Sequence, residues 1–453
     1  MQRALFVGLG TLLVTLGCGD DDLPVMFPDA SIDAAPFDAA PFDAATDDGG
    51  PSFEDAGADA DGMDAGRTGP PAPVSGRVTF ERRVLSRRGL EAPVAETLAG
   101  VDVILIEGAT QLGLTSTAAD GSYEFDVELS GEVRVRVLAS GNGVAVTDFR
   151  DNTYAFEVQV VDGRADVVVD IDEMSGALAI YETMNEGLAF ARDAFDRAEA
   201  FPELQVYWER GRTTPGGTSY AAGDQLWILG GPSDTDEFDT PVLLHELGHY
   251  LQWVYDFYDV VPGNFHNGAD TDARLAWGEG WASFFSSAAR GTGFYGDSIG
   301  EDLAYDLDVE ALPLAGEYVC SPAAGIQQTL SEWVITASLY ELYLTGDPAE
   351  QRQRSFAPIR DRLSRDASDR GLPGVDFVDF IDAYLCNAGG AQDALVEDVI
   401  VNNRRFPHDL TPSCKPGDRP GLQRFLRMPP AVSLPGVIAR DLSGRSFRVI
   451  QVD

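Results

Sequence analysis

The sequence predicts a multidomain protein in which an all-β sandwich is followed by a mainly helical α+β domain. The chain has 453 residues, more than one ordinary domain holds. Between residues 73 and 171 apolar residues alternate with a period near two, and from about Ser175 the period changes toward 3.6. Hydrophobic residues make up 44% of the chain, a globular value, so any disorder belongs to particular segments.

The first eighteen residues have the pattern of an export signal. Arg3 precedes an apolar run over residues 4–16, which is too short to span a bilayer. Cys18 follows a Leu-Gly pair and precedes GDDD, an arrangement that resembles the lipobox of bacterial lipoproteins. The resemblance implies an exported lipoprotein anchored to the outer membrane or cell surface through a lipidated Cys18. Thr15 stands where leucine is usual, so cleavage and secretion is the alternative.

Residues 19–72 are expected to form a disordered acidic tether. Residues 19–66 hold fourteen Asp or Glu, no Lys or Arg, and the repeat PFDAAPFDAA. Such a segment repels itself and has too little apolar surface to offset the entropy lost on ordering. Calcium binding by DADGMDAG is a weaker alternative, because the terminal glutamate and the spacing of a calcium loop are missing. The net charge of the whole chain, −42, argues against nucleic acid as a partner.

Residues 73–172 are predicted to form the antiparallel β-sandwich. Asp120 and Gly121 suit a tight hairpin, after which Tyr123 and Phe125 point to the same buried face. The pattern resembles the transthyretin-like regulatory domains attached to carboxypeptidases and to many exported bacterial proteins. The segment contains no recognisable catalytic constellation, so a spacer or docking module is expected rather than a catalytic one. Turn residues separate seven predicted strand segments: SGRVTFERRV, GVDVILIEG, LTSTAA, GSYEFDVEL, EVRVRVLAS, YAFEVQVV and ADVVVDI.

Residues 175–453 are predicted to form the mainly helical domain. An amphipathic helix is expected over residues 185–201, followed by strands over 204–211 and 224–231. Short strands followed by a run of helices indicate an α+β unit. Further helices are expected over residues 241–258, 272–290, 331–344, 377–386 and 391–403.

Three cysteines follow Cys18, and export would place them in an oxidising compartment. One disulfide and one free thiol among Cys320, Cys386 and Cys414 is the simplest outcome, with the pair left open. None of them lies at C-x-x-C spacing, which argues against a zinc site made of cysteines.

The sequence TPVLLHELGHYLQW carries a metal-binding pattern on a predicted helix. Thr240 is a good N-cap and Pro241 suits the first helical position. His245 and His249 lie four residues apart, one above the other, so both imidazoles can reach one zinc ion. Glu246 is then close to the ion without ligating it. The apolar stripe on another face is formed by Leu244, Leu247, Leu251 and Val254.

Two satisfied surface histidines are the alternative interpretation of this pattern. The chain contains only four histidines, and random placement gives H-E-x-x-H in on the order of a few chains per thousand of this composition. A zinc site also needs a third protein ligand. Gln252 and Tyr255 occupy the positions of the glycine and third histidine in the extended H-E-x-x-H-x-x-G-x-x-H motif, so this ligand must come from elsewhere.

The segment WGEGWASFF resembles the third-ligand segment of gluzincin metallopeptidases, in the forms found in the M1 aminopeptidases and in fungalysin-type enzymes. The resemblance covers residues 240–290 and implies a zincin-like catalytic domain that binds Zn²⁺. It implies Glu279 as the third ligand and Ser283 as the support of a ligating histidine. The glycines on either side of Glu279 are expected to let the metal-bearing helix approach closely. No Gly-x-Met-Glu-Asn segment is present to capture a free amine, so cleavage within a chain is expected.

The mechanism expected from this site is hydrolysis of a peptide bond by zinc-activated water, with Glu246 as the general base. The oxyanion donor is left open among four residues: Tyr295, Tyr318, Tyr340 and His266. The strand DQLWILGG either offers an edge to an extended peptide or has its edges buried.

The leading hypothesis is therefore an exported zinc endopeptidase that acts on peptides or proteins. A non-catalytic surface binding or adhesion lipoprotein and a zinc hydrolase of another amide or ester are the alternatives. Subsite residues and oligomeric state cannot be predicted from these patterns.

Overall fold

The computed structural model describes most of the chain from residue 73 onward. The described residues are 73–127, 129, 131–231, 233–259, 261, 268–312, 320–363, 370–388, 393–414, 439–440 and 446–447. They belong to one compact unit, Thr68–Asp453. The predicted export signal with Cys18 and the predicted acidic tether lie outside them. Among the described residues no helix has the length and apolar character needed to cross a membrane.

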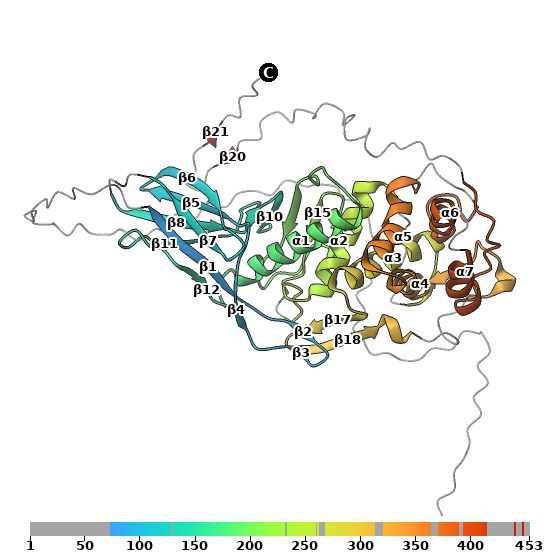
Figure 1. Ribbon diagram of the computed structural model, residues 1–453. Coiled ribbons are helices and arrows are strands. Elements are labelled where there is room, and N and C mark those ends of the chain that lie inside the picture. Colours follow the sequence, from blue (N-terminus) through green and yellow to red (C-terminus); the bar gives the residue numbers. More distant parts are fainter. Residues whose placement is uncertain are drawn as a thin grey trace, which may run out of the picture. The chain divides into compact units, whose positions relative to one another are not determined.

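A β-rich region comes first and a helical region follows, as the sequence predicts (Figure 1). One sheet has the order β12-β1-β4, with β7 also paired to β1, and another has the order β11-β8-β5-β6. Side chains of β1, β5, β7, β8 and β12 are buried at roughly alternate positions in one shared core. The strands are β1 (Val74–Arg82), β4 (Val94–Thr97), β5 (Asp102–Glu107), β6 (Thr110–Ser116), β7 (Ser122–Phe125), β8 (Val133–Leu138), β11 (Ala155–Gln159) and β12 (Val167–Val169).

A five-stranded sheet joins the two regions. Its order is β14-β15-β13-β10-β9, and β10 pairs in parallel with β13, so that Val144 lies beside Leu204. It therefore combines strands from both sides of the predicted boundary at residues 172–175. Helices α1 (Ser175–Ala194) and α2 (Thr240–Tyr255) contact its strands. The strands are β9 (Ser140–Gly141), β10 (Val144–Thr147), β13 (Leu204–Tyr207), β14 (Tyr220–Ala222) and β15 (Gln225–Trp227).

Helix α1 (Ser175–Ala194) starts and ends earlier than the predicted range 185–201, which is therefore wrong at both ends. Its first seven residues, 175–181, are all buried, so they show no amphipathic period that a sequence pattern could detect. The helix ends before Asp196, whose φ of 48° lies in the left-handed region.

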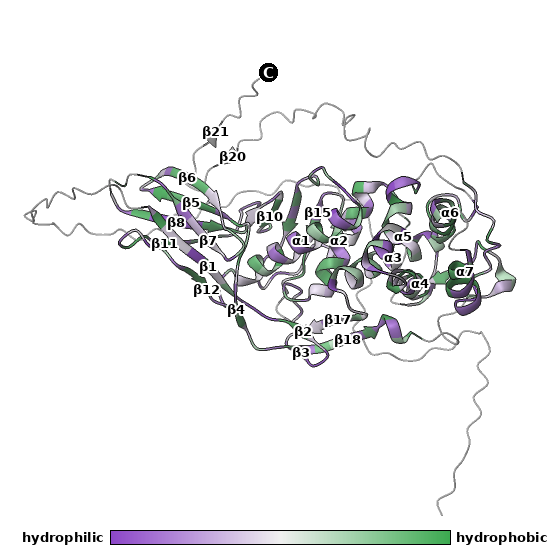
Figure 2. Cartoon of the chain, viewed as in Figure 1, coloured by the Kyte–Doolittle hydropathy of each residue, from purple (hydrophilic) through white to green (hydrophobic). Residues whose placement is uncertain are grey.

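The later helices agree with the predicted ranges to within a few residues, apart from α5 (Pro348–Asp361), which was not predicted. Helix α5 is mostly polar and contains Pro358, so its sequence lacks a clear apolar stripe. Helices α4 and α6 are coloured as hydrophobic over much of their length in Figure 2, consistent with their buried positions. The remaining segments are α2 (Thr240–Tyr255), α3 (Ala273–Arg290), α4 (Glu332–Leu344), α6 (Phe377–Ala388), α7 (Asp393–Val396) and the π-helical η3 (Glu397–Asn403).

Four short two-stranded ribbons complete the described structure, none of them predicted. The largest joins β17 (Phe294–Ile299) to β18 (Asp302–Asp308), with a register irregularity after Asp297. A second joins β2 (Leu85–Ser86) to β3 (Gly89–Leu90). The others pair β16 (Asp270–Thr271) with β19 (Leu330–Ser331) and β20 (Ala439–Arg440) with β21 (Ser446–Phe447).

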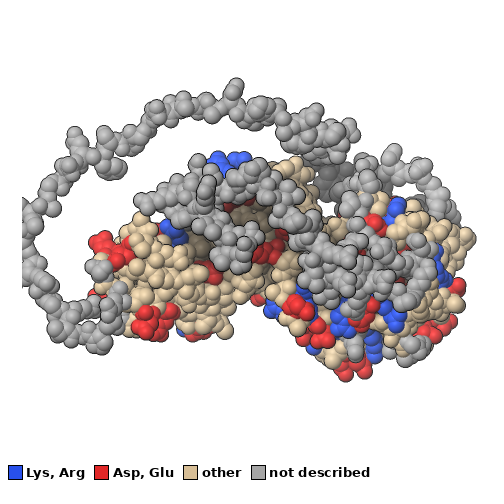
Figure 3. Space-filling view, turned by 90° about the horizontal axis from the view of Figure 1, so that it is seen from above, with Lys and Arg blue, Asp and Glu red and all other residues tan. Residues whose placement is uncertain are grey.

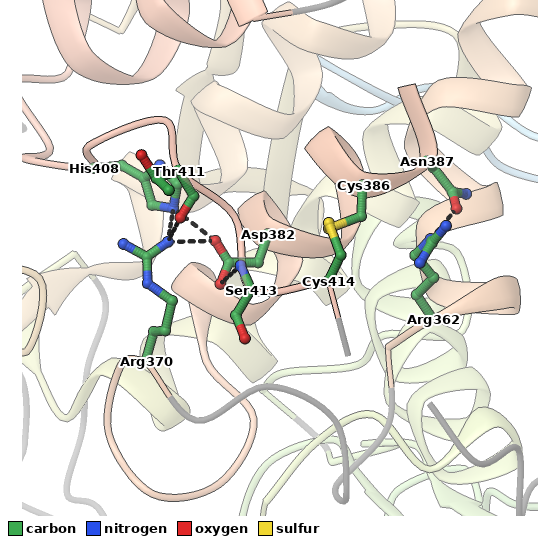
Figure 4. Close-up of a disulfide and its surroundings, with 9 residues drawn as sticks. All are labelled: Arg362, Arg370, Asp382, Cys386, Asn387, His408, Thr411, Ser413 and Cys414. Carbon is green, nitrogen blue, oxygen red and sulfur yellow. Dashed lines mark hydrogen bonds and ion pairs between the residues drawn. A yellow bond between two sulfur atoms is a disulfide. The ribbon is translucent and has the colours of Figure 1, made fainter. Parts of the chain in front are cut away.

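Cys386 and Cys414 form the disulfide, and Cys320 is free and buried. This outcome confirms the prediction of one bridge and one free thiol. Figure 4 shows the bridge at the end of α6, beside Asp382. The Asp382 carboxylate also accepts a hydrogen bond from the backbone N of Ser413 at 3.1 Å. The chain that follows η3 is therefore attached to α6 at two adjacent points.

His408 has a structural role in the same region. Its Nδ1 accepts a hydrogen bond from the backbone N of Leu410 at 3.1 Å, so the ring proton lies on Nε2, which donates to Asp382 at 2.9 Å. Arg370 adds an ion pair to the same carboxylate at 2.8 Å (Figure 4). Because both ring nitrogens are occupied, this buried histidine has no atom left for a metal or a substrate.

Candidate metal centre

Helix α2 carries two of the candidate metal ligands. The prediction of Thr240 as the N-cap is wrong: Asp239 occupies that position and Thr240 is the first helical residue. The Asp239 side chain does not cap the helix; its carboxylate accepts hydrogen bonds from the backbone N and Oγ of Ser298 at 2.8 and 2.9 Å. The start of α2 is thereby attached to β17.

The structure brings His245, His249 and Glu279 together. The two histidine Nε2 atoms lie 3.0 Å apart, and each lies 3.2 Å from Oε2 of Glu279. Zinc bonds of about 2.0–2.1 Å in a tetrahedral arrangement place two ligand atoms about 3.3 Å apart. The three atoms therefore have the spacing of three corners of a zinc tetrahedron, and the residues fit the ion. Their side chains are 13%, 21% and 16% exposed, so the site is partly open to solvent.

Each histidine is oriented through its other ring nitrogen. Nδ1 of His245 lies 3.0 Å from Oγ of Ser283, the contact that the gluzincin resemblance implies. Nδ1 of His249 lies 3.1 Å from Oε1 of Gln252. The amide of Gln252 is itself fixed, because its Nε2 donates to the carbonyl of Gly278 at 2.6 Å. Both contacts leave Nε2 of each ring directed at the candidate metal position.

Gln252 is a site residue that the sequence patterns did not identify. In the sequence Gln252 marks a departure from the extended motif. Its position three residues after His249 could have identified it as a partner of that histidine, because residues three apart on a helix are neighbours. It is fully buried, and a buried amide side chain requires partners.

Two glycines, Gly248 and Gly280, allow the helices of the site to approach closely, and only the second of them was predicted to do so. The contact between α2 and α3 is made at Gly248, where a Cβ would lie 2.8 Å from Cα of Ala282. Gly280 is equally restricted, but toward α4, since a Cβ there would lie 2.7 Å from the carbonyl O of Glu332. Gly278 has ordinary space around it, with the nearest atom at 3.7 Å. The prediction that the glycines beside Glu279 face the metal-bearing helix is therefore wrong for Gly280.

The ligand set attracts positive charge. Burial alone would lower the pKa of His249, but the adjacent Glu279 carboxylate overrides it and raises that pKa to about 9. Burial would raise the pKa of Glu279, yet the imidazoles of His249 and His245 hold that pKa well below its usual range. A metal cation at this position would replace the proton of His249 as the partner of the carboxylate.

Glu246 and Tyr295 lie beside the ligands. Glu246 is 6% exposed, and its charge contributes to the raised pKa values of both His249 and Tyr295. The Tyr295 ring is 6.2 Å from the His245 ring, centroid to centroid, and 6.0 Å from that of Trp333. Burial, followed by the charge of Asp297, holds the pKa of Tyr295 well above its usual value, so the phenol keeps its proton and can donate it.

The other three oxyanion candidates differ from Tyr295. Tyr340 is buried in α4 and stacks on Tyr343, with ring centroids 6.3 Å apart, as expected for a core residue. Tyr318 and His266 lie outside the described residues. Among the described candidates, Tyr295 is therefore the one whose ring contacts a candidate metal ligand, His245.

The strand β15 has both edges occupied. It pairs in parallel with β13 and antiparallel with β14. Of the two alternatives for DQLWILGG, the structure supports the buried edge. Within this sheet the edge strands are β14 and β9, so a substrate strand could be added only there.

A second group of carboxylates lies near the start of α2. One oxygen each from Asp234, Asp236 and Asp297 lies within 4.8 Å of the others. Burial is the main reason that the pKa of Asp234 is raised to about 6 and that of Asp236 well above its usual value. These groups hold protons that exposed aspartates would release.

No family model matches this chain, and a search of curated proteins finds no match either. The function must therefore be argued from the residues of the site.

Proposed function

We propose that this chain is a zinc-dependent peptidase, with the helical region as a zincin-like catalytic domain of gluzincin type. The observation that carries the proposal is the convergence of His245, His249 and Glu279 at 3.0–3.2 Å. Two histidines four residues apart on one helix and a carboxylate from another leave one corner of a tetrahedron for water, as catalytic zinc sites require. Cleavage within chains is preferred to removal of terminal residues, because no segment for capture of a free amine is recognised in the sequence.

In the proposed reaction the metal, when bound, supplies a water of lowered pKa and polarises the scissile carbonyl. Glu246 accepts the proton of the attacking water and passes it to the leaving amine. Tyr295 donates its phenolic proton in a hydrogen bond to the developing oxyanion. Ser283 and Gln252 hold the two imidazoles in the tautomer whose Nε2 is free for the metal.

The proposal extends to the rest of the chain. The two sheets of the β-rich region would form a transthyretin-like β-sandwich that serves as an accessory domain. The N-terminal pattern supports export as a lipoprotein acylated at Cys18, with release by ordinary cleavage as the alternative. Mass spectrometry of the mature N-terminus distinguishes the two, because only the first leaves an acylated cysteine.

The experiment that tests the activity compares the parent with Glu246→Gln. Both proteins are expected to contain zinc, and only the parent should cleave a denatured protein mixture, since loss of a general base lowers turnover about 10²- to 10⁴-fold. Sequencing of the new termini identifies the preferred bonds. If neither protein holds zinc, the enzyme proposal fails. Zinc without cleavage by the parent would favour a binding or adhesion protein, or a hydrolase of another amide or ester.

A further inference from the structure

An arm of the β-rich region contacts the hairpin that carries Tyr295. The arm consists of residues 83–91, between β1 and β4, and contains the ribbon β2–β3. In Figure 1 it extends from the β-rich region and lies beside β17 and β18. Both strands of the arm contact the hairpin, β2 at β17 and β3 at β18.

Arg87, at the tip of the arm, holds the hairpin through three groups. Its guanidinium forms ion pairs with Asp308 at 2.6 Å and with Asp306 at 3.3 Å. The same group lies over the ring of Phe294, 4.9 Å from its centroid. One side chain therefore contacts both strands of the hairpin, and a guanidinium is suited to such simultaneous pairing and stacking.

Two further contacts fix the arm against the turn of the hairpin. Arg83 pairs with Glu301 at 2.8 Å, and the backbone N of Leu90 donates to the carbonyl O of Glu301 at 2.9 Å. Gly89 passes so close that a Cβ would lie 2.1 Å from the same carbonyl. The contact thus depends on backbone fit as well as on charge.

The side chains that Arg87 contacts lie on the opposite face of the hairpin from Tyr295. Phe294 pairs with Asp308 across the ribbon, and Tyr295 with Leu307. Successive residues of a strand point to opposite faces, so Phe294 and Asp308 face the arm while Tyr295 faces His245. The ribbon therefore lies between the arm and the candidate metal centre, with one face toward each.

We infer that the arm holds the hairpin in place, with Arg87 as a positioning residue for Tyr295, and that the β-rich region is thereby a functional part of the metal centre. The effect on catalysis rests on the proposed function; the effect on the hairpin does not. Arg87→Ala should loosen the hairpin and misplace the phenol while leaving the three metal ligands intact.

Hydrogen exchange of the full-length protein tests the positioning directly. Amides of residues 294–308 are expected to exchange about two- to five-fold faster in Arg87→Ala than in the parent, as loss of partly exposed ion pairs would produce. Arg88→Ala is the matched control, since among the described residues the ion pair of Arg88 is with Glu91, inside the arm. A second pair of variants is Gly89→Ala, which should displace the arm, and Gly108→Ala, a positive-φ glycine in open space. Unchanged exchange in both Arg87→Ala and Gly89→Ala overturns the inference.

Peptidase kinetics provide the second measurement. Arg87→Ala should lower kcat about three- to ten-fold at unchanged zinc content, because a displaced transition-state donor slows the reaction without removing the metal. A parent without peptidase activity would contradict the proposed function alone, since the exchange experiment still tests the arm. Faster exchange with unchanged kcat would show that the hairpin does not position a catalytic group, and would overturn the catalytic part of the inference.

Discussion

At the scale of single residues, the candidate metal centre includes side chains that contact the two histidines through their Nδ1 atoms. Ser283→Ala removes the contact of His245 Nδ1, and we expect it to weaken zinc binding about ten-fold or more, the usual effect of losing such a partner. Ser286→Ala is the matched control, because Ser286 lies one turn further on α3 and donates instead to the carbonyl of Pro241. Competition with a fluorescent chelator measures both affinities. Equal affinities in the two variants would contradict the assigned role of Ser283.

The buried carboxylates near the start of α2 predict a pH dependence of stability. Burial raises the pKa of Asp239 to about 8 and that of Asp297 above its usual value, whereas both are near 3.8 when exposed. Between these values the folded protein binds protons that the unfolded chain has lost, so the free energy of unfolding decreases as pH rises from about 4 to 8. Thermal unfolding should show a falling Tm over this range. Asp297→Asn should reduce the fall, and an unchanged slope would contradict the assignment.

At the scale of elements, the approach of α2 to α3 sets the geometry of the ligand triad. Gly248→Ala places a methyl group 2.8 Å from Cα of Ala282, where the backbone cannot move aside, so we expect a loss of about 1–3 kcal/mol in the free energy of unfolding and weaker zinc binding. Gly278→Ala has ordinary space and should stabilise α3 by up to about 1 kcal/mol through helix propensity. Denaturant titration compares the two, and similar effects would contradict the close helix contact.

Elements with a clear period were predictable, and those defined by tertiary contacts were not. Helix α2 and its two histidines follow from the sequence, since spacing on a helix fixes which side chains meet. Glu279 was placed by resemblance, and Ser283 with it. The hairpin β17–β18 was not predicted because Gly296 and Asp297 interrupt the apolar pattern of β17. Leu303, Tyr305 and Leu307 do alternate with small or polar residues in β18, but the sequence shows no partner strand for them. The sequence therefore offers Tyr295 as one of four candidate oxyanion donors and gives no reason to prefer it.

At the scale of the whole molecule, the two regions are joined more closely than the sequence patterns indicated. Strand β13 takes its partner on one side, β10, from the β-rich region, a long-range pairing that no local pattern predicts. Figure 3 shows acidic and basic side chains mixed on the described surface. Some of the described ion pairs are half-exposed, such as that of Arg77 with Asp120, and such pairs add little to the free energy of unfolding. The shared sheet and core join the two regions, and the ion pairs of Arg83 and Arg87 add a contact at the hairpin β17–β18.

This joining predicts that the helical region does not fold alone. A fragment that begins at Ser175 would lose β10 and leave an open edge on β13, with apolar side chains such as Val206 less well covered. We expect the fragment to aggregate or to lack near-ultraviolet circular dichroism, whereas a fragment beginning at residue 73 should fold. A folded, zinc-binding fragment from Ser175 would contradict this account.

We propose that one divalent ion is held jointly by α2 and α3. Anomalous diffraction at the zinc absorption edge, on crystals of the zinc-loaded protein, locates such an ion without reference to activity. We expect a single strong peak within bonding distance, about 2.0–2.2 Å, of Nε2 of His245, Nε2 of His249 and a carboxylate oxygen of Glu279. A peak elsewhere, or one that contacts the histidines while Glu279 points away from it, would show that α2 and α3 do not share a metal ion.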